Sequence, residues 1–176
     1  MTTAEYLQLP ETVVPQELAF GTLRVADSPT ASHQRVVRDV ALEIAAYLRE
    51  HFLGELLFAP MDVILDADAA LVVQPDLLVI STGRAHLVRD RVYGAPDLVV
   101  EVLSPYPRIG SLTERLEWFA RYGVTECWVA RLHGRELSVL TLDDGVYREK
   151  TFRSAERLES RVLPGIGVTP LQIFGW

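Results

Sequence analysis

The stretch APDLVVEVLSP, residues 95–105, places one carboxylate inside an apolar run. Residues 98–103 are apolar except for Glu101, and a short run of this kind is typical of a buried β-strand. An isolated carboxylate is so costly to bury that it normally pairs with a cation, binds a metal or becomes neutral. We therefore expect the fold to bring a positive charge or a metal ion to this strand.

Length and composition restrict the class of protein to which this chain can belong. A chain of 176 residues that is 49% hydrophobic can form one domain with a real core, which we assign to residues 1–176. Cys127 is the only cysteine, so an internal disulfide framework and a cysteine-based zinc site are excluded, and a reducing cytoplasm is the expected setting. The first residues lack the features of a signal peptide, and no apolar run approaches the roughly 18 residues of a membrane span.

The net charge of −7 argues against a protein whose whole surface coats nucleic acid. It is compatible with a local basic groove, because binding depends on the local potential.

Hydrophobic periodicity predicts an α/β (α+β) fold, a mixed β-sheet flanked by a helix on each face. Ser28 and Pro29 are expected to start the first helix, and Gly123 is expected to end the second. Prolines 105 and 107 should stop the strand that carries Glu101. The expected strands are 17–25 with a turn at Gly21, 55–65, 70–81, 95–105, 126–132, a hairpin of 136–142 and 146–152, and a short strand in the tail 161–174. The expected helices are 28–52 and 111–122.

Three acids precede or interrupt apolar strands: Asp76, Asp97 and Glu101. Asp97 and Glu101 lie four residues apart on one strand, so their Cα atoms are roughly 13 Å apart and cannot easily share one ion. Neighbouring strands are only about 4.8 Å apart, so Asp76 on an adjacent strand can meet Glu101. Asp97 is then expected to be a turn or strand-start residue.

Several segments together resemble the Uma-type "putative restriction endonuclease" family of the PD-(D/E)XK nuclease superfamily. The resemblance covers nearly the whole chain, and its most specific part is GAPDLVVEVLSP followed by a helix that ends in YGVTECWV. It also includes SPTASHQ and ALVVQPDLLVI.

This resemblance implies a restriction-endonuclease-like fold that hydrolyses DNA phosphodiester bonds, possible homodimers, and Mg²⁺ or Mn²⁺ as cofactor. By position, Asp76 and Glu101 would be the catalytic metal ligands, with the backbone carbonyl of Val102 completing the site. His33 and Gln34 match the residues before the family's first helix and would contact substrate. Hard cations on carboxylates can provide the charge stabilisation and the nucleophile that such hydrolysis needs.

The chain departs from the family at the lysine that accompanies the acid pair. One lysine position is Leu103, and the alternative position on the following helix is Arg115, with Ser111 in place of an aspartate. Thr22 replaces a glutamate of the first hairpin, and Arg131 lies near another expected aspartate. Arg115 follows the apolar stripe of its helix, so we expect it to face Glu101 as an electrostatic catalytic group.

Each assignment has a structural alternative. Glu101 could form an ion pair with an arginine, Arg115 could extend along its stem to the surface, and His33 could serve in packing or capping. The first function hypothesis is a Mg²⁺-dependent endonuclease. The second is a catalytically degenerate domain that keeps the fold to bind nucleic acid or a partner protein.

Overall fold

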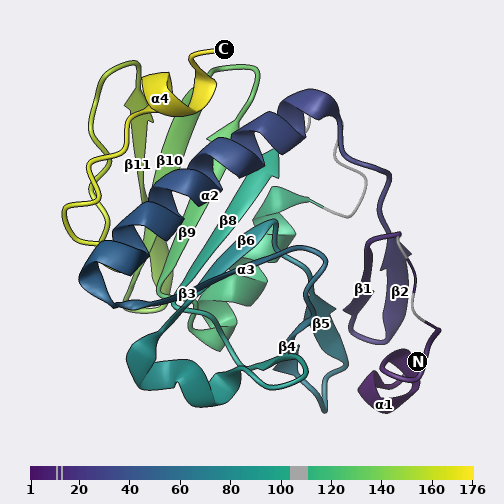
Figure 1. Ribbon diagram of the computed structural model, residues 1–176. Helices are drawn as coiled ribbons and strands as arrows, with labels where there is room; N and C mark the ends of the chain where they lie inside the picture. Colours follow the sequence, from purple (N-terminus) through teal and green to yellow (C-terminus); the bar gives the residue numbers. More distant parts are fainter. Residues whose placement is uncertain (11, 13, 104–110) are drawn as a thin grey trace.

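The computed structural model describes residues 1–10, 12, 14–103 and 111–176, and their strands form two mixed sheets that meet near the start of β6 (Figure 1). The expected α/β class is confirmed, although the second sheet was not predicted. The helices are α1 Thr3–Tyr6, α2 Ala31–His51, α3 Leu112–Tyr122 and α4 Pro170–Phe174, with a 3₁₀ helix, η1, at Thr82–Leu87; the strands are β1 Gln16–Ala19, β2 Thr22–Val25, β3 Gly54–Phe58, β4 Val63–Asp66, β5 Leu71–Val73, β6 Leu77–Ser81, β7 Val92–Tyr93, β8 Leu98–Leu103, β9 Glu126–Arg131, β10 Glu136–Asp143 and β11 Val146–Arg153.

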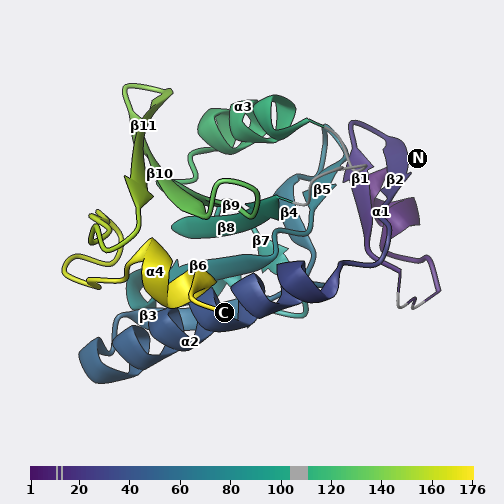
Figure 2. The same ribbon diagram turned by 90° about the horizontal axis from the view of Figure 1, so that it is seen from above.

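The larger sheet has strand order β11-β10-β9-β8-β6-β3 within the described residues. β8 and β9 run parallel and are joined through α3, while the other neighbours pair antiparallel. Figure 2 shows α2 on one side of this sheet and α3 on the other, which is the arrangement predicted from the sequence. Buried on both faces, β8 can be apolar along its length except where a polar partner is supplied.

Helix α2 starts later than the sequence suggested. Thr30 is its N-cap, and the Thr30 side chain accepts a hydrogen bond from the backbone N–H of His33. Ser28 and Pro29 therefore lie before the helix, and the next hydroxyl in the chain takes the capping position. The expectation for α3 is confirmed: Ser111 caps its start, and Gly123 ends it with a φ of 84°.

Two expected strands are each divided between the sheets. Residues 55–65 form β3 in the larger sheet and β4 in the smaller one, and residues 70–81 form β5 and β6 in the same way. A proline stands at each break, Pro60 and Pro75, and a proline cannot donate to the strand ladder. Prolines 105 and 107, expected to end β8, lie outside the described residues.

The smaller sheet has the order β2-β1-β5-β4-β7 within the described part of the chain. Its β1–β2 hairpin turns at Gly21 as predicted, with a φ of 83°. The polar segment 83–94, expected to be a loop, contains part of η1 and the short strand β7. The tail forms no strand; it ends in α4, which Thr169 caps. Nowhere in the described residues is there a helix long and apolar enough to cross a membrane.

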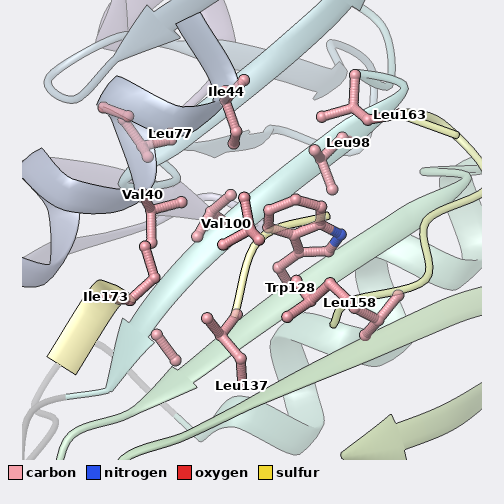
Figure 3. Packing of buried hydrophobic residues seen from close by; sticks show 14 of the residues in the cluster. Val40, Ile44, Leu77, Leu98, Val100, Trp128, Leu137, Leu158, Leu163 and Ile173 are labelled. Carbon is pink, nitrogen blue, oxygen red and sulfur yellow. The ribbon is translucent and has the colours of Figure 1, made fainter. Parts of the chain in front are cut away.

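The main core lies between α2, the larger sheet and the tail (Figure 3). Val40 and Ile44 of α2 pack toward Val100 of β8 and Trp128 of β9, and all four are almost completely buried. Ile173 of α4 joins the same cluster, so the tail is part of the core rather than an appendage.

One buried carboxyl attaches the tail to this core. Glu126 is fully buried and accepts hydrogen bonds from the Trp128 indole at 2.7 Å, the Arg161 backbone at 2.7 Å and the Ser160 hydroxyl.

We predict that Glu126→Gln lowers the free energy of unfolding by about 1–3 kcal/mol, because an amide replaces one accepting oxygen with a donor and leaves buried N–H groups unpaired. Urea unfolding measures the effect, with exposed Glu117→Gln as the control; equal midpoints for parent and Glu126→Gln would contradict it.

Candidate active site

Two carboxylates, one on β8 and one directly before β6, lie opposite each other where the larger sheet meets the smaller one. β6 and β8 pair with Leu77 opposite Val100, and continuing this register places Asp76 opposite Glu101. Asp76 Oδ2 accepts a hydrogen bond of 2.8 Å from the backbone N–H of Val102. Asp76 directly precedes β6, so the predicted meeting of Asp76 and Glu101 across neighbouring strands is confirmed in register, with Asp76 just outside the strand. Residues opposite one another share a sheet face.

A buried arginine connects Glu101 to a third carboxylate. Arg115 of α3 donates to Glu101 Oε1 through Nη2 at 2.6 Å and Nε at 3.1 Å. Its Nη1 donates to both oxygens of Glu17, at 2.7 and 2.6 Å. Glu17 comes from β1 of the smaller sheet and is only 2% exposed. The guanidinium thus bridges the two sheets through two buried ion pairs.

The charges of this cluster are strongly coupled. Burial, the largest effect, raises the pKa of Glu101; the charge of Asp76 raises it further and Arg115 opposes the rise, leaving a pKa of about 7. Burial by itself would lower the pKa of Arg115, but the charges of Glu101 and Glu17 outweigh burial and raise it. The arginine is therefore a permanent cation, whereas Glu101 ionises near neutral pH.

This raised pKa predicts a pH-dependent stability in metal-free buffer. The Glu101 pKa rises from 4.5 to about 7 on folding, so the folded state favours the protonated acid. Its stabilising contribution is complete below pH 4.5 and is lost as pH rises through about 7, a change of about 3 kcal/mol. Glu101→Gln cannot ionise and should remove this slope, whereas Glu117→Gln on the exposed face of α3 should keep it. Urea unfolding across this pH range in EDTA measures both, and an unchanged slope in Glu101→Gln would refute the assignment.

His33 approaches the acid pair from the start of α2. Its Nε2 lies 3.3 Å from Asp76 Oδ2, and its ring is buried, with no hydrogen-bond partner for Nδ1 among the described residues. Burial alone would lower the pKa of His33, but the hydrogen bond and charge of Asp76, the charge of Glu101 and the backbone of Val102 raise it. Gln34, the other predicted substrate contact, is exposed on the helix surface. Substrate contact stays a prediction for both residues.

Three other positions singled out in the sequence take no part in the contacts among Asp76, Glu101 and Arg115. Asp97 accepts the backbone N–H of Ser81 at 2.8 Å and pairs with Arg84 at 3.1 Å, as expected for a strand-start residue. Thr22 is exposed on β2, away from the cluster. Arg131 donates to Ser138 and pairs with Glu149 at 3.1 Å, so its contacts are with the β10–β11 hairpin.

Sequence reasoning missed Glu17, which completes the cluster. Like Glu101, it is a lone acid next to apolar residues in a strand, and that similarity was the available signal. Its partner lies 98 positions away on a helix and its strand belongs to the other sheet. Spacing along the chain could not reveal that contact.

The larger sheet has a helix on each face and an acidic pair near its centre. The chain is similar over 100% of its length, and over 98% of the other chain, to the crystal structure of "a putative nuclease belonging to DUF820" from Anabaena variabilis ATCC 29413, with a TM-score of 0.79 and 17% identity. The model of the Uma2 family, described as "Putative restriction endonuclease", matches residues 3–172. The chain belongs to this family. Comparison with curated proteins found no match.

Proposed function

We propose that the protein is a metal-dependent endonuclease that hydrolyses DNA phosphodiester bonds at the Asp76–Glu101 pair. The observation that carries the proposal is two facing carboxylates beside a buried arginine on a nuclease-like fold. Their mutual repulsion contributes to the raised pKa of Glu101, so a divalent cation between them would relieve an existing electrostatic cost.

The donor atoms fit a hard cation such as Mg²⁺ or Mn²⁺. Within the described residues, the hydrogen bonds to Asp76 use Oδ2 and those from Arg115 to Glu101 use Oε1, so each carboxylate has a second oxygen for a ligand. Among the described residues, no group of three or more His, Cys, Asp or Glu side chains is arranged for a metal. Mg²⁺ commonly uses one or two carboxylates with water and substrate oxygens, and here Asp76, Glu101 and the Val102 carbonyl would hold it.

The bound ion would supply charge stabilisation on the phosphate and a nucleophile at neutral pH. The chain's own groups would hold and orient the reacting phosphate. Arg115 would be an electrostatic clamp on the negative charge that develops during hydrolysis. It would not transfer protons, because a guanidinium keeps its proton at any ordinary pH.

One observation favours the second candidate, a nucleic-acid- or partner-binding domain without hydrolysis. Arg115 already neutralises parts of Glu17 and Glu101, so the cluster has an internal cation before any metal binds.

Calorimetric titration with Mn²⁺ and Mg²⁺, together with plasmid nicking, separates the two candidates. The enzyme proposal expects a saturable Mn²⁺ isotherm that Glu101→Gln loses, and Mg²⁺-dependent nicking by the parent. A parent that binds DNA in EDTA, yet shows neither metal binding nor nicking, would establish the binding domain instead.

A further inference from the structure

A pocket of about 260 Å³ opens at the N-terminal end of α2. Figures 1 and 2 show the C-terminal segment lying against the N-terminal half of α2, which brings distant parts of the chain together here. The residues that line the pocket come from α2, the β9–β10 turn and the C-terminal segment: Ser32, Leu132, His133, Arg135, Phe174 and Trp176.

The pocket is connected to the acid pair through α2. Ser32 lines the pocket and directly precedes His33, whose ring lies 3.3 Å from Asp76. Leu132 packs on the α2 side of the larger sheet, whereas Glu101 faces Arg115 of α3 on the other side. A nucleic acid strand that reaches both sites would therefore pass around the end of the sheet, beside Ser32 and His33.

The pocket presents an aromatic surface. Trp176 is 44% exposed, whereas Trp118 and Trp128 are buried. The guanidinium carbon of Arg35 lies 5.1 Å from the centre of the Trp176 ring. Aromatic rings and arginine planes of this kind are the surfaces on which unpaired bases stack.

Positive charge lies in and next to the pocket: Arg135 lines it, and Arg35 stacks on Trp176. Arg35 and Arg135 are exposed and form no ion pair within the part of the chain that the structure describes. The acid that follows the turn, Glu136, is already paired with Arg153 at 2.7 Å. In a chain with a net charge of −7, two unpaired arginines beside an aromatic ring create a local attraction for phosphate.

We propose that this pocket binds an unpaired nucleotide of the substrate strand, with its base stacked on Trp176 and its phosphate held by Arg35 and Arg135. The proposal rests on the proposed function, because the bound strand would continue into the acid pair. An unpaired nucleotide is required because the bases of a duplex stack on one another and do not offer their faces to a protein ring.

Binding of a dye-labelled short oligo(dT), measured by fluorescence anisotropy in EDTA, tests the pocket without any cleavage. We expect Trp176→Leu to weaken binding by about tenfold, as loss of one base–aromatic stack does. Arg135→Gln should weaken binding severalfold and reduce the slope of affinity against salt by about one. Intrinsic fluorescence of the parent should fall on binding, because Trp176 is the exposed tryptophan.

Matched controls place the effect in the pocket. Phe52→Leu removes an aromatic ring that is 85% exposed at the opposite end of α2, and Arg121→Gln removes an exposed arginine of α3. Both should bind like the parent. An abasic strand of equal length should bind about tenfold more weakly than oligo(dT).

Equal binding by Trp176→Leu and the parent, or equal binding of the abasic and normal strands, would overturn the inference, and so would a parent that binds no oligonucleotide. Nicking and Mn²⁺ binding by that same parent would show that the proposed function stands without the pocket. Oligonucleotide binding without nicking or Mn²⁺ binding would support the nucleotide pocket and contradict the proposed endonuclease activity.

Discussion

Replacing Arg115 with alanine is expected to lower the free energy of unfolding by about 3–5 kcal/mol in metal-free buffer, because it leaves two buried carboxylates without their shared cation. Glu17 is 2% exposed and Glu101 is 9% exposed, so water cannot replace the guanidinium. Arg115→Lys should lose less, since an ammonium keeps the charge but cannot reproduce the forked bonds to both acids. Urea unfolding in EDTA measures both variants, with exposed Arg121→Ala on the same helix as control.

Divalent metal adds a second, diagnostic readout for this substitution. If Asp76 and Glu101 hold an ion, saturating Mn²⁺ should restore much of the stability that Arg115→Ala loses, because it supplies the missing positive charge. In Mg²⁺-dependent plasmid nicking, Arg115→Ala should be slower by about tenfold or more, and Arg115→Lys should keep or exceed the parent rate. An alanine variant as stable and as fast as the parent would remove Arg115 from both roles. Nicking by the lysine variant alone would show that arginine at position 115 is what prevents hydrolysis by this chain.

The central pair of the site could be predicted because its signals are local. Glu101 interrupts an apolar strand and Asp76 directly precedes another, and only neighbouring strands bring carboxylates within reach of one ion. Arg115 was predictable from helical spacing, which puts it on the face directed at the sheet. The structure adds that Glu101 does have an arginine partner, so the ion-pair alternative for Glu101 is confirmed.

The parts that escaped prediction depend on contacts between distant segments. Periodicity recognises β4 and β6 as strands, but it carries no information on which sheet each joins, so the breaks at Pro60 and Pro75 were missed. The contact of Glu17 with Arg115 depends on how the two sheets meet. The pocket around Trp176 depends on the tail folding against α2. Such arrangements follow from tertiary packing rather than from the local pattern.

Asp76→Asn is expected to abolish divalent binding while the fold stays intact. It should also lower the nicking rate by about 100-fold or more, which corresponds to an activation barrier higher by at least about 2.7 kcal/mol. The asparagine Oδ1 can still accept the Val102 N–H that Asp76 Oδ2 accepts at 2.8 Å, so the strand contact survives. Removing one of two facing negative charges also relieves repulsion in the metal-free protein. Asp97→Asn is the matched control, because Asp97 also follows a proline at a strand start but pairs with Arg84 instead.

Thermal melts with and without Mn²⁺ measure the binding effect of Asp76→Asn, and a proton NMR titration of His33 adds an independent readout. Asp76 is the nearest charge that raises the pKa of His33, so this pKa should fall in Asp76→Asn and stay unchanged in Asp97→Asn. A fall in the His33 pKa with normal Mn²⁺ stabilisation would show that Asp76 holds the histidine and not the metal. If Mn²⁺ stabilises Asp76→Asn as much as the parent, the ion binds elsewhere and the acid pair is not the catalytic centre.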